Sequence, residues 1–115
     1  MTVSFIQLNM KKALTAAIEL TASLEKVKSY VCLLTEPHVY KGQPCALPPK
    51  CQSFCNEGET RSSIIASRDL KIIKIGHLTN KDCTVGLLKL SGKNFLMASV
   101  YMAVSYTHLT LPTKA

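Results

Sequence analysis

Three hydrophobic patterns follow one another in the first 35 residues, and their order constrains the fold more than any other feature of the chain. Residues 4–9, SFIQLN, alternate apolar and polar side chains, which is typical of a half-buried strand. Residues 10–29 carry apolar side chains at helical spacing, and residues 31–35 form a continuous apolar run of strand length. Strand, helix and buried strand in this order predict a βαβ unit whose two strands are parallel. The helix is expected to pack through Leu14, Ala17, Ile18, Thr21, Leu24 and Val27.

Polar residues end both strands of this unit. Asn9 ends the first strand and Glu36 follows the second. Carboxyl ends of parallel strands lie at one edge of a sheet, and open α/β sheets bind ligands at that edge, so we expect these two side chains on a shared rim. The spacing alone supports other roles: Asn9 is also suited to cap a helix that begins at Met10, and Glu36 would serve equally as a solvated edge carboxylate.

The rest of the chain predicts a long loop followed by antiparallel strands. Residues 37–61 contain prolines and glycines without a period, and a loop of this length is usually functional or mobile. Residues 62–67, 71–75, 83–90 and 95–101 have the composition of strands, with turns at residues 68–69 and 91–94. We therefore predict an antiparallel meander in the second part of the chain.

Charge and hydropathy limit the classes of partner. Fourteen Lys and Arg face seven Asp and Glu, a net charge of +7 that favours nucleic acid, an acidic membrane surface or a phosphorylated substrate. The lysines are scattered, so a soluble basic domain is an equal alternative. No apolar run reaches the ~20 residues that span a bilayer, and the N-terminus lacks the pattern of a secretory signal. We expect an intracellular protein without a membrane partner.

The cysteines are expected to be free thiols. The chain has five, an odd number, and no signal peptide, which argues against a disulfide framework. A zinc site would need Cys45, Cys51 and Cys55 with His38 as the fourth ligand, but no CxxC pair is present, and the prediction disfavours zinc.

Asn9, Glu36 and Tyr101 stand at the ends of apolar strands and suit phosphodiester chemistry. One carboxylate such as Glu36 can anchor a magnesium-type ion, which keeps several waters. The Asn9 amide can orient that carboxylate or a phosphate oxygen, and the Tyr101 phenol can donate to a non-bridging phosphate oxygen. A half-buried ring that closes a strand is an equally good interpretation of Tyr101.

At these residues the sequence resembles the endonuclease/exonuclease/phosphatase superfamily. IQLN is similar to the first strand of that group with its active-site Asn, LLTEP to the motif with the metal-binding Glu, and ASVYM to the strand with the active-site Tyr. EPHVYKGQPCALP and SSIIASRDLKI resemble more closely the endonuclease domain of non-LTR retrotransposon polyproteins. The similarity covers residues 3–102.

The resemblance implies a fold, an activity and partners. The fold would be α/β (α+β), the N-terminal part of a four-layered α/β sandwich with mixed sheets. The activity would be nicking of DNA with Mg²⁺ or Mn²⁺, where the nick primes reverse transcription, in partnership with the parent reverse transcriptase polyprotein and the element RNA, in the nucleus. Asn9, Glu36 and Tyr101 would be catalytic, with Glu36 the metal ligand. Tyr40, Lys41 and Arg61 would contact DNA, although a solvated loop and a surface arginine are the plain alternatives.

The sequence departs from the family at its water-activating residues. No D-x-N and no S-D-H motif is present, because the only aspartates are Asp69 and Asp82, and Thr35 replaces the usual Gln. We therefore expect residues 1–102 to be a truncated, inactive domain. Residues 103–115 contain no acidic residue and no period, and we expect a non-native or disordered tail there, although an ordinary frayed tail is an alternative.

Two other functions are compatible with the sequence. A non-catalytic basic module would bind nucleic acid through the same lysines, without any role for Glu36. A phosphatase or phosphodiesterase of the same superfamily would act on small molecules or lipids. The VYKG loop, residues 39–42, is the feature that favours the retrotransposon branch.

Overall fold

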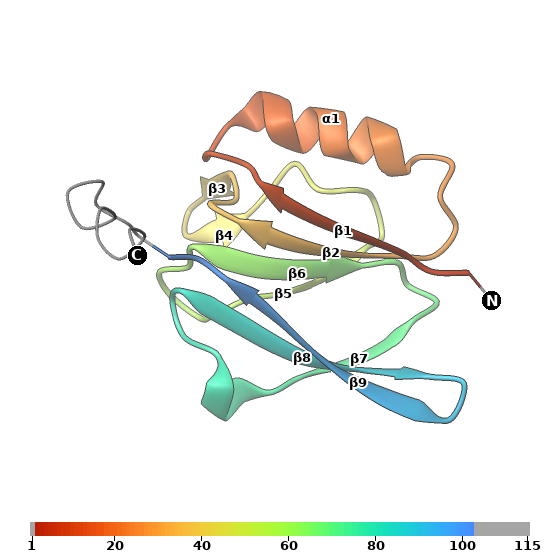
Figure 1. The fold of residues 1–115 in the computed structure, drawn as a ribbon. Coiled ribbons are helices and arrows are strands. Elements are labelled where there is room, and N and C mark those ends of the chain that lie inside the picture. The colour runs from red at the N-terminus through yellow and green to blue at the C-terminus, as the bar shows by residue number, and fades with distance from the viewer. Residues whose placement is uncertain (1, 103–115) are drawn as a thin grey trace, which may run out of the picture.

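The computed structural model describes residues 2–102, in which a helix and two packed sheets form three layers, with a separate two-stranded sheet beside them (Figure 1). Helix α1 (Leu14–Leu24) covers the outer face of a four-stranded sheet with the order β1-β2-β6-β5. The inner face of that sheet packs on a three-stranded sheet with the order β7-β8-β9. The predicted tail at 103–115 lies outside the described residues. The strands are β1 (Ser4–Asn9), β2 (Tyr30–Thr35), β3 (Val39–Tyr40), β4 (Gln43–Pro44), β5 (Gln52–Phe54), β6 (Ser62–Ala66), β7 (Lys71–Lys74), β8 (Cys83–Leu90) and β9 (Lys93–Val100), with a 3₁₀ turn η1 (Gly76–Leu78).

The predicted βαβ unit is confirmed. β1 and β2 are parallel, and Asn9 lies opposite Thr35 at the carboxyl end of both strands. β2 also pairs with β6 in antiparallel register, so the first sheet is mixed, as the fold class requires. The α/β sandwich with mixed secondary structure is therefore the observed fold class, with three layers in the part of the chain that the structure describes.

β2 is apolar throughout because it belongs to two hydrophobic cores. Tyr30, Cys32 and Leu34 face the helix, whereas Val31 and Leu33 face the second sheet. Each fully buried Val or Leu contributes about 1.5–3 kcal/mol relative to an exposed one. The outer core contains Met10, Ala17, Leu20, Leu24, Tyr30, Cys32, Leu34 and Ile65, and the inner core contains Val31, Ile64, Ala66, Leu70, Ile72, Leu88 and Met97.

The predicted helix at 10–29 is wrong in its bounds and partly wrong in its buried face. The helix begins only at Leu14, because Lys11 and Lys12 adopt left-handed conformations with φ of 52° and 58°. Asn9 is not the N-cap, since Ala13 holds that position without a side-chain cap. Of the expected packing residues, Leu14 and Ile18 are about half exposed; the buried helical residues are Ala17, Leu20 and Leu24.

The predicted loop at 37–61 contains three short strands. β3 and β4 form a hairpin whose two turn residues, Lys41 and Gly42, have φ of 54° and 80°. Positive φ at both central residues is the mark of a tight hairpin turn. β5 pairs with β6 and becomes the edge of the first sheet. Two- and three-residue strands carry too little periodicity to be recognised in the sequence.

The predicted meander is correct for three of its four strands. β7, β8 and β9 are consecutive and antiparallel, and Ser91 and Gly92 form the expected tight turn between β8 and β9. β6, however, pairs with β2 and β5 in the first sheet. The turn at 68–69 therefore carries the chain from one sheet to the other.

The cysteines are free thiols, as expected, and no cluster of three metal-ligating side chains occurs among residues 2–102. Burial of Cys32 between α1 and the sheet raises the pKa of its thiol to about 12. Within the same range, none of the helical structure is long and apolar enough to cross a membrane.

Polar side chains stabilise the end of the first sheet that lies away from Asn9, at the start of β2 and the end of β6. The Tyr30 N–H donates to Ser67 Oγ, and the Ser67 N–H donates to the Tyr30 carbonyl. Ser29 Oγ donates to the carboxylate of Asp69. This hydrogen bond has the largest effect on the pKa of Asp69, and a second hydrogen bond from Ser67 adds to it. Together they hold the pKa of Asp69 below its ordinary value.

The Asp69 carboxylate is expected to make the fold acid-sensitive. A carboxyl whose pKa is lower in the folded state stabilises the fold above its unfolded pKa of ~3.9, and that stability is lost as pH falls through the folded pKa. Between pH 5 and pH 2, the midpoint of urea unfolding should therefore fall more steeply for the wild-type chain than for Asp69→Asn. Glu57→Gln, which changes an exposed carboxylate, serves as the control. Equal slopes for wild type and Asp69→Asn would contradict this assignment.

Candidate functional site

Asn9 and Glu36 meet at the shared rim of β1 and β2. Asn9 Nδ2 donates to Glu36 Oε2 over 3.0 Å. Asn9 Oδ1 accepts the Lys11 N–H over 2.8 Å, which fixes the amide so that its NH₂ group faces the carboxylate. The side chain that the sequence allowed as a helix cap thus orients an acid.

The Glu36 backbone holds its side chain at the rim in a conformation that is costly for this residue. Glu36 has φ of 48°, and the left-handed region costs a non-glycine residue roughly 1–2 kcal/mol. Two hydrogen bonds maintain it: the Glu36 N–H donates to the Arg61 carbonyl and the Lys12 N–H donates to the Glu36 carbonyl, each over 2.8 Å. Such strain is characteristic of functional positions.

Backbone hydrogen bonds extend this rim to the second sheet. The Arg61 N–H donates to the Lys81 carbonyl over 2.6 Å, and the Tyr101 N–H donates to the Asp82 carbonyl over 2.7 Å. The ends of β1, β2 and β9 therefore lie on one side of the molecule together with the starts of β6 and β8, near the β3–β4 hairpin (Figure 1).

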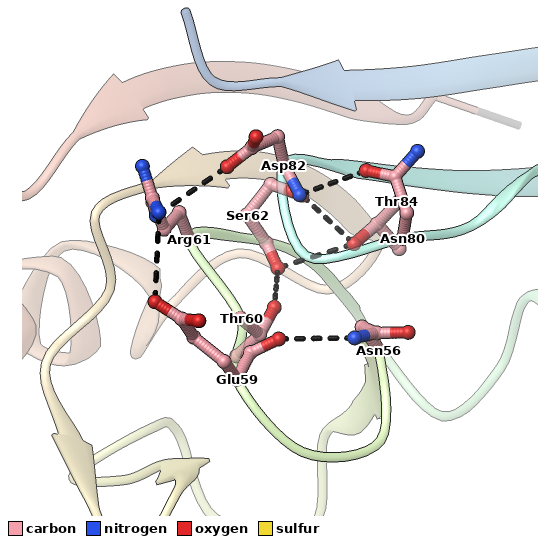
Figure 2. A network of polar contacts seen from close by, with 8 residues as sticks. All are labelled: Asn56, Glu59, Thr60, Arg61, Ser62, Asn80, Asp82 and Thr84. Atoms are coloured by element: carbon pink, nitrogen blue, oxygen red, sulfur yellow. Dashed lines mark hydrogen bonds and ion pairs between the residues drawn. The ribbon is translucent and has the colours of Figure 1, made fainter. Parts of the chain in front are cut away.

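The Arg61 side chain joins the two sheets at this rim (Figure 2). Its Nε lies 3.4 Å from Asp82 Oδ1, and its Nη2 lies 3.5 Å from Glu59 Oε2. The guanidinium carbon is 5.6 Å from the centre of the Tyr101 ring, within the range of a cation–π interaction. Arg61 thereby holds the Tyr101 ring at the rim.

Buried hydroxyls support the segment that carries Arg61. Thr60 Oγ1 donates to the Ser62 carbonyl over 2.6 Å, and Ser62 Oγ lies 3.0 Å from Thr84 Oγ1 (Figure 2). Asn56 Nδ2 donates to the Glu59 carbonyl over 3.0 Å. The hydroxyl pair joins β6 to β8 inside the molecule, so the backbone on either side of Arg61 is anchored.

A pocket of about 230 Å³ opens at the rim beside Glu36. Two cationic residues, Lys12 and Arg61, and two anionic residues, Glu36 and Glu59, line it. Pro37, Thr60 and the hairpin residues Val39 and Gly42 complete its wall. A larger pocket of about 500 Å³ lies between the end of α1 and residues 48–50, but its lining is mainly apolar and contains neither Asn9 nor Glu36.

The β3–β4 hairpin presents an aromatic ring and a cation next to this pocket. The Tyr40 side chain is 67% exposed, and Lys41 Nζ lies 5.4 Å from the centre of its ring. The tight turn explains the KG pair of the VYKG motif, since glycine adopts the φ of 80° without strain.

The structure thus brings four of the six predicted site residues together in two groups, while Tyr40 and Lys41 lie on the β3–β4 hairpin. Asn9 and Glu36 are hydrogen-bonded, and Arg61 and Tyr101 are stacked. Arg61 links the groups, because its carbonyl binds Glu36 while its side chain covers Tyr101; the phenol itself is not part of the pocket wall. His38 is a loop residue whose Nδ1 lies 3.3 Å from the Lys12 carbonyl.

Sequence reasoning missed Lys12, Glu59 and Asp82. Lys12 was detectable, since a Lys-Lys pair directly after a strand-ending Asn places a cation at the rim. Glu59 and Asp82 precede strands of different sheets, and their convergence on Arg61 depends on how those sheets pack.

The donor set at the rim fits a magnesium-type ion. Glu36 supplies one carboxylate whose Oε2 is oriented by Asn9, and this carboxylate is not part of a cluster of three or more acidic, His or Cys side chains among residues 2–102. Mg²⁺ suits such a site because it is commonly held by one or two carboxylates and keeps several waters.

Replacement of Glu36 should reveal the strain in its backbone. Glu36→Gly and Glu36→Ala both remove the carboxylate, but glycine accepts the left-handed conformation, so the glycine variant should be more stable by ~1 kcal/mol in urea unfolding. Glu57, an exposed residue without a positive φ, is the matched position, and there Gly should not exceed Ala. If Glu36→Gly and Glu36→Ala were equally stable, the backbone of residue 36 would not be strained, and this prediction would be wrong.

Comparison with known proteins bears on the fold. No protein-family model matches the sequence, and no curated protein matches it. Among solved structures, the chain is similar to the "Endonuclease domain of TRAS1, a telomere-specific non-LTR retrotransposon", with a TM-score of 0.62 and 20% sequence identity. The match covers 85% of this chain and 44% of that one, so the chain spans less than half the length of this neighbour. The fold expected from the resemblance to retrotransposon endonuclease domains is confirmed.

Proposed function

We propose that this chain is part of a metal-dependent endonuclease that nicks DNA to prime reverse transcription in a non-LTR retrotransposon. The observation that carries the proposal is the 3.0 Å hydrogen bond from Asn9 to Glu36 at the common end of two parallel strands. The nuclease-like fold supports it. The parent reverse transcriptase polyprotein, the element RNA and a nuclear site of action follow from this function as further parts of the proposal.

Each rim residue has a role in this chemistry. Glu36 is the metal ligand, and Asn9 keeps its carboxylate in one orientation. When bound, Mg²⁺ or Mn²⁺ supplies neutralisation of charge on the phosphoryl group and on the leaving oxygen. The Tyr101 phenol, held by the Arg61 stack, donates to a non-bridging phosphate oxygen as charge develops there.

DNA is the substrate that the charges favour. The net charge is +7, and affinity for DNA comes largely from Lys and Arg that neutralise phosphates. We propose that Lys41 and the exposed Tyr40 ring, on a hairpin beside the pocket, contact a phosphate and a base or sugar.

The attacking water needs a base, and the sequence contains neither of the motifs that would supply one in the family that it resembles. The 115 residues contain neither D-x-N nor S-D-H, and His38 has a ring nitrogen directed to the Lys12 carbonyl. We therefore propose that the chain alone binds metal and DNA without cleaving DNA efficiently.

Metal binding can be tested without cleavage. Electron paramagnetic resonance of Mn²⁺ should show that the wild-type chain depletes free Mn²⁺, that Glu36→Gln abolishes this, and that Asn9→Ala weakens it by ~10-fold, because the amide orients the ligand. Glu25→Gln, an exposed carboxylate at the other end of α1, should behave as wild type. Equal losses in Glu25→Gln and Glu36→Gln, or no loss in Glu36→Gln, would contradict a site at Glu36.

Cleavage of DNA gives a second test. The chain with Mg²⁺ should leave supercoiled plasmid intact, because the sequence has neither the D-x-N nor the S-D-H motif to activate water. Robust nicking that Glu36→Ala abolishes would disprove the proposed inactivity. DNA binding that is salt-dependent but insensitive to chelation and to Glu36→Ala would favour the non-catalytic module instead, and turnover of a phosphoinositide without any action on DNA would favour the phosphatase.

A further inference from the structure

The guanidinium of Arg61 lies between two carboxylates in different environments. Asp82 Oδ1 is buried, accepts no hydrogen bond, and has Arg61 Nε at 3.4 Å. Glu59 is 66% exposed and lies 3.5 Å from Nη2. Loss of the first contact would leave a buried carboxylate oxygen unpaired, whereas the second can be exchanged with solvent at little cost. Arg61 thus has one fixed and one exchangeable anion.

Glu59, the exchangeable anion, is the one of the two carboxylates that lines the pocket. Arg61 and Glu59 both line the 230 Å³ pocket, whereas Asp82 does not. Lys12, an exposed residue, adds a second cation to the lining, and the Glu36 carboxylate lies in the same wall. An anion that enters the pocket would therefore meet Arg61 at the position that Glu59 holds.

We propose that this pocket is a phosphate-binding subsite formed by Lys12 and Arg61, and that Glu59 competes with phosphate for Arg61. The chemistry favours phosphate because a guanidinium presents parallel N–H donors that match its oxygens, and a lysine adds a compact charge. The volume is below the ~300 Å³ at which pockets for drug-sized ligands begin, which suits a single phosphate group.

The identity of the phosphate rests on the proposed function. If the substrate is DNA, the subsite takes a backbone phosphate next to the one that Glu36 addresses, and Glu59 must leave Arg61 when DNA binds. Binding would then be weakened by the ion pair that is broken. The same donors would also accept inorganic pyrophosphate, which provides a probe that is independent of nucleic acid.

Removal of Glu59 should tighten phosphate binding. In EDTA, fluorescence anisotropy with a 20-bp duplex should give a Kd that is ~5-fold lower for Glu59→Gln than for wild type, the scale of one exposed ion pair. Glu57→Gln removes the same charge from the same exposed loop and should change Kd less than ~2-fold, as expected for a screened charge. Titration with pyrophosphate should give the same ranking.

The cation side of the subsite has its own matched pair. Lys12→Gln should weaken pyrophosphate binding, whereas Lys71→Gln, an exposed lysine of β7 at the end of the sheet away from the rim, should not. Both lysines are exposed, so neither change is expected to affect folding, which circular dichroism verifies.

The outcomes separate the subsite from the proposed function. Equal effects of Glu59→Gln and Glu57→Gln on both probes would overturn the subsite and leave the endonuclease proposal standing. Tighter pyrophosphate binding by Glu59→Gln, with no DNA binding by any variant, would support the subsite and overturn DNA as the substrate.

Discussion

The hydrogen bond from the Glu36 N–H to the Arg61 carbonyl is the contact on which the arrangement of the rim depends. It joins the end of β2 to the residue before β6, and Arg61 in turn binds the backbone at Lys81 and the side chain of Asp82. One residue thus fixes Glu36, which follows β2 of one sheet, relative to Tyr101, which follows β9 of the other. Together with the hydrogen bond from the Lys12 N–H to the Glu36 carbonyl, this contact maintains the left-handed backbone of Glu36, whose carboxylate accepts the hydrogen bond from Asn9.

The strand that leads to the rim is buried on both faces, and this packing supports the rim. β2 packs against α1 through Cys32 and Leu34 and against the second sheet through Val31. Ser99 Oγ also donates to the Leu34 carbonyl over 2.7 Å and ties β9 to β2 inside the molecule. A site on strand ends with this support holds its geometry more precisely than one on free loops, and catalytic or metal-binding groups require that precision. β9, in contrast to β2, is partly exposed. Its Leu96 and Val100 side chains are 66% and 51% exposed. Among residues 2–102 it pairs with one strand only, β8.

The sequence predicts the parts of this architecture that local pattern controls. The alternation of residues 4–9 and the continuous apolar run of 31–35 predict the parallel pair, and parallel pairing alone brings Asn9 and Glu36 to one edge. The Ser91–Gly92 turn was also predictable, because its residues favour a tight hairpin. The start of α1 was not, since the backbone N–H of Lys11 competes for the Asn9 side chain that would have capped a helix. The sequence also does not indicate that β6 belongs to the first sheet. The turn at residues 68–69 has a composition that can either close a hairpin or connect two sheets. The Arg61 network depends on the packing of two sheets, so neither Glu59 nor Asp82 carries a local signal that indicates its partner.

The central claim is that Asn9 and Glu36 form one cation site at the rim, and nuclear magnetic resonance tests it most directly. In a titration of the ¹⁵N-labelled chain with Mg²⁺, the side-chain NH₂ of Asn9 and the backbone amides of Glu36, Lys12 and Arg61 should shift together and saturate with one affinity. These groups are joined by the hydrogen bonds of the rim, so a change in charge at the carboxylate reaches all of them. Saturable shifts centred elsewhere, for example at the Ser91–Gly92 turn, with no change at the Asn9 NH₂, would contradict the account.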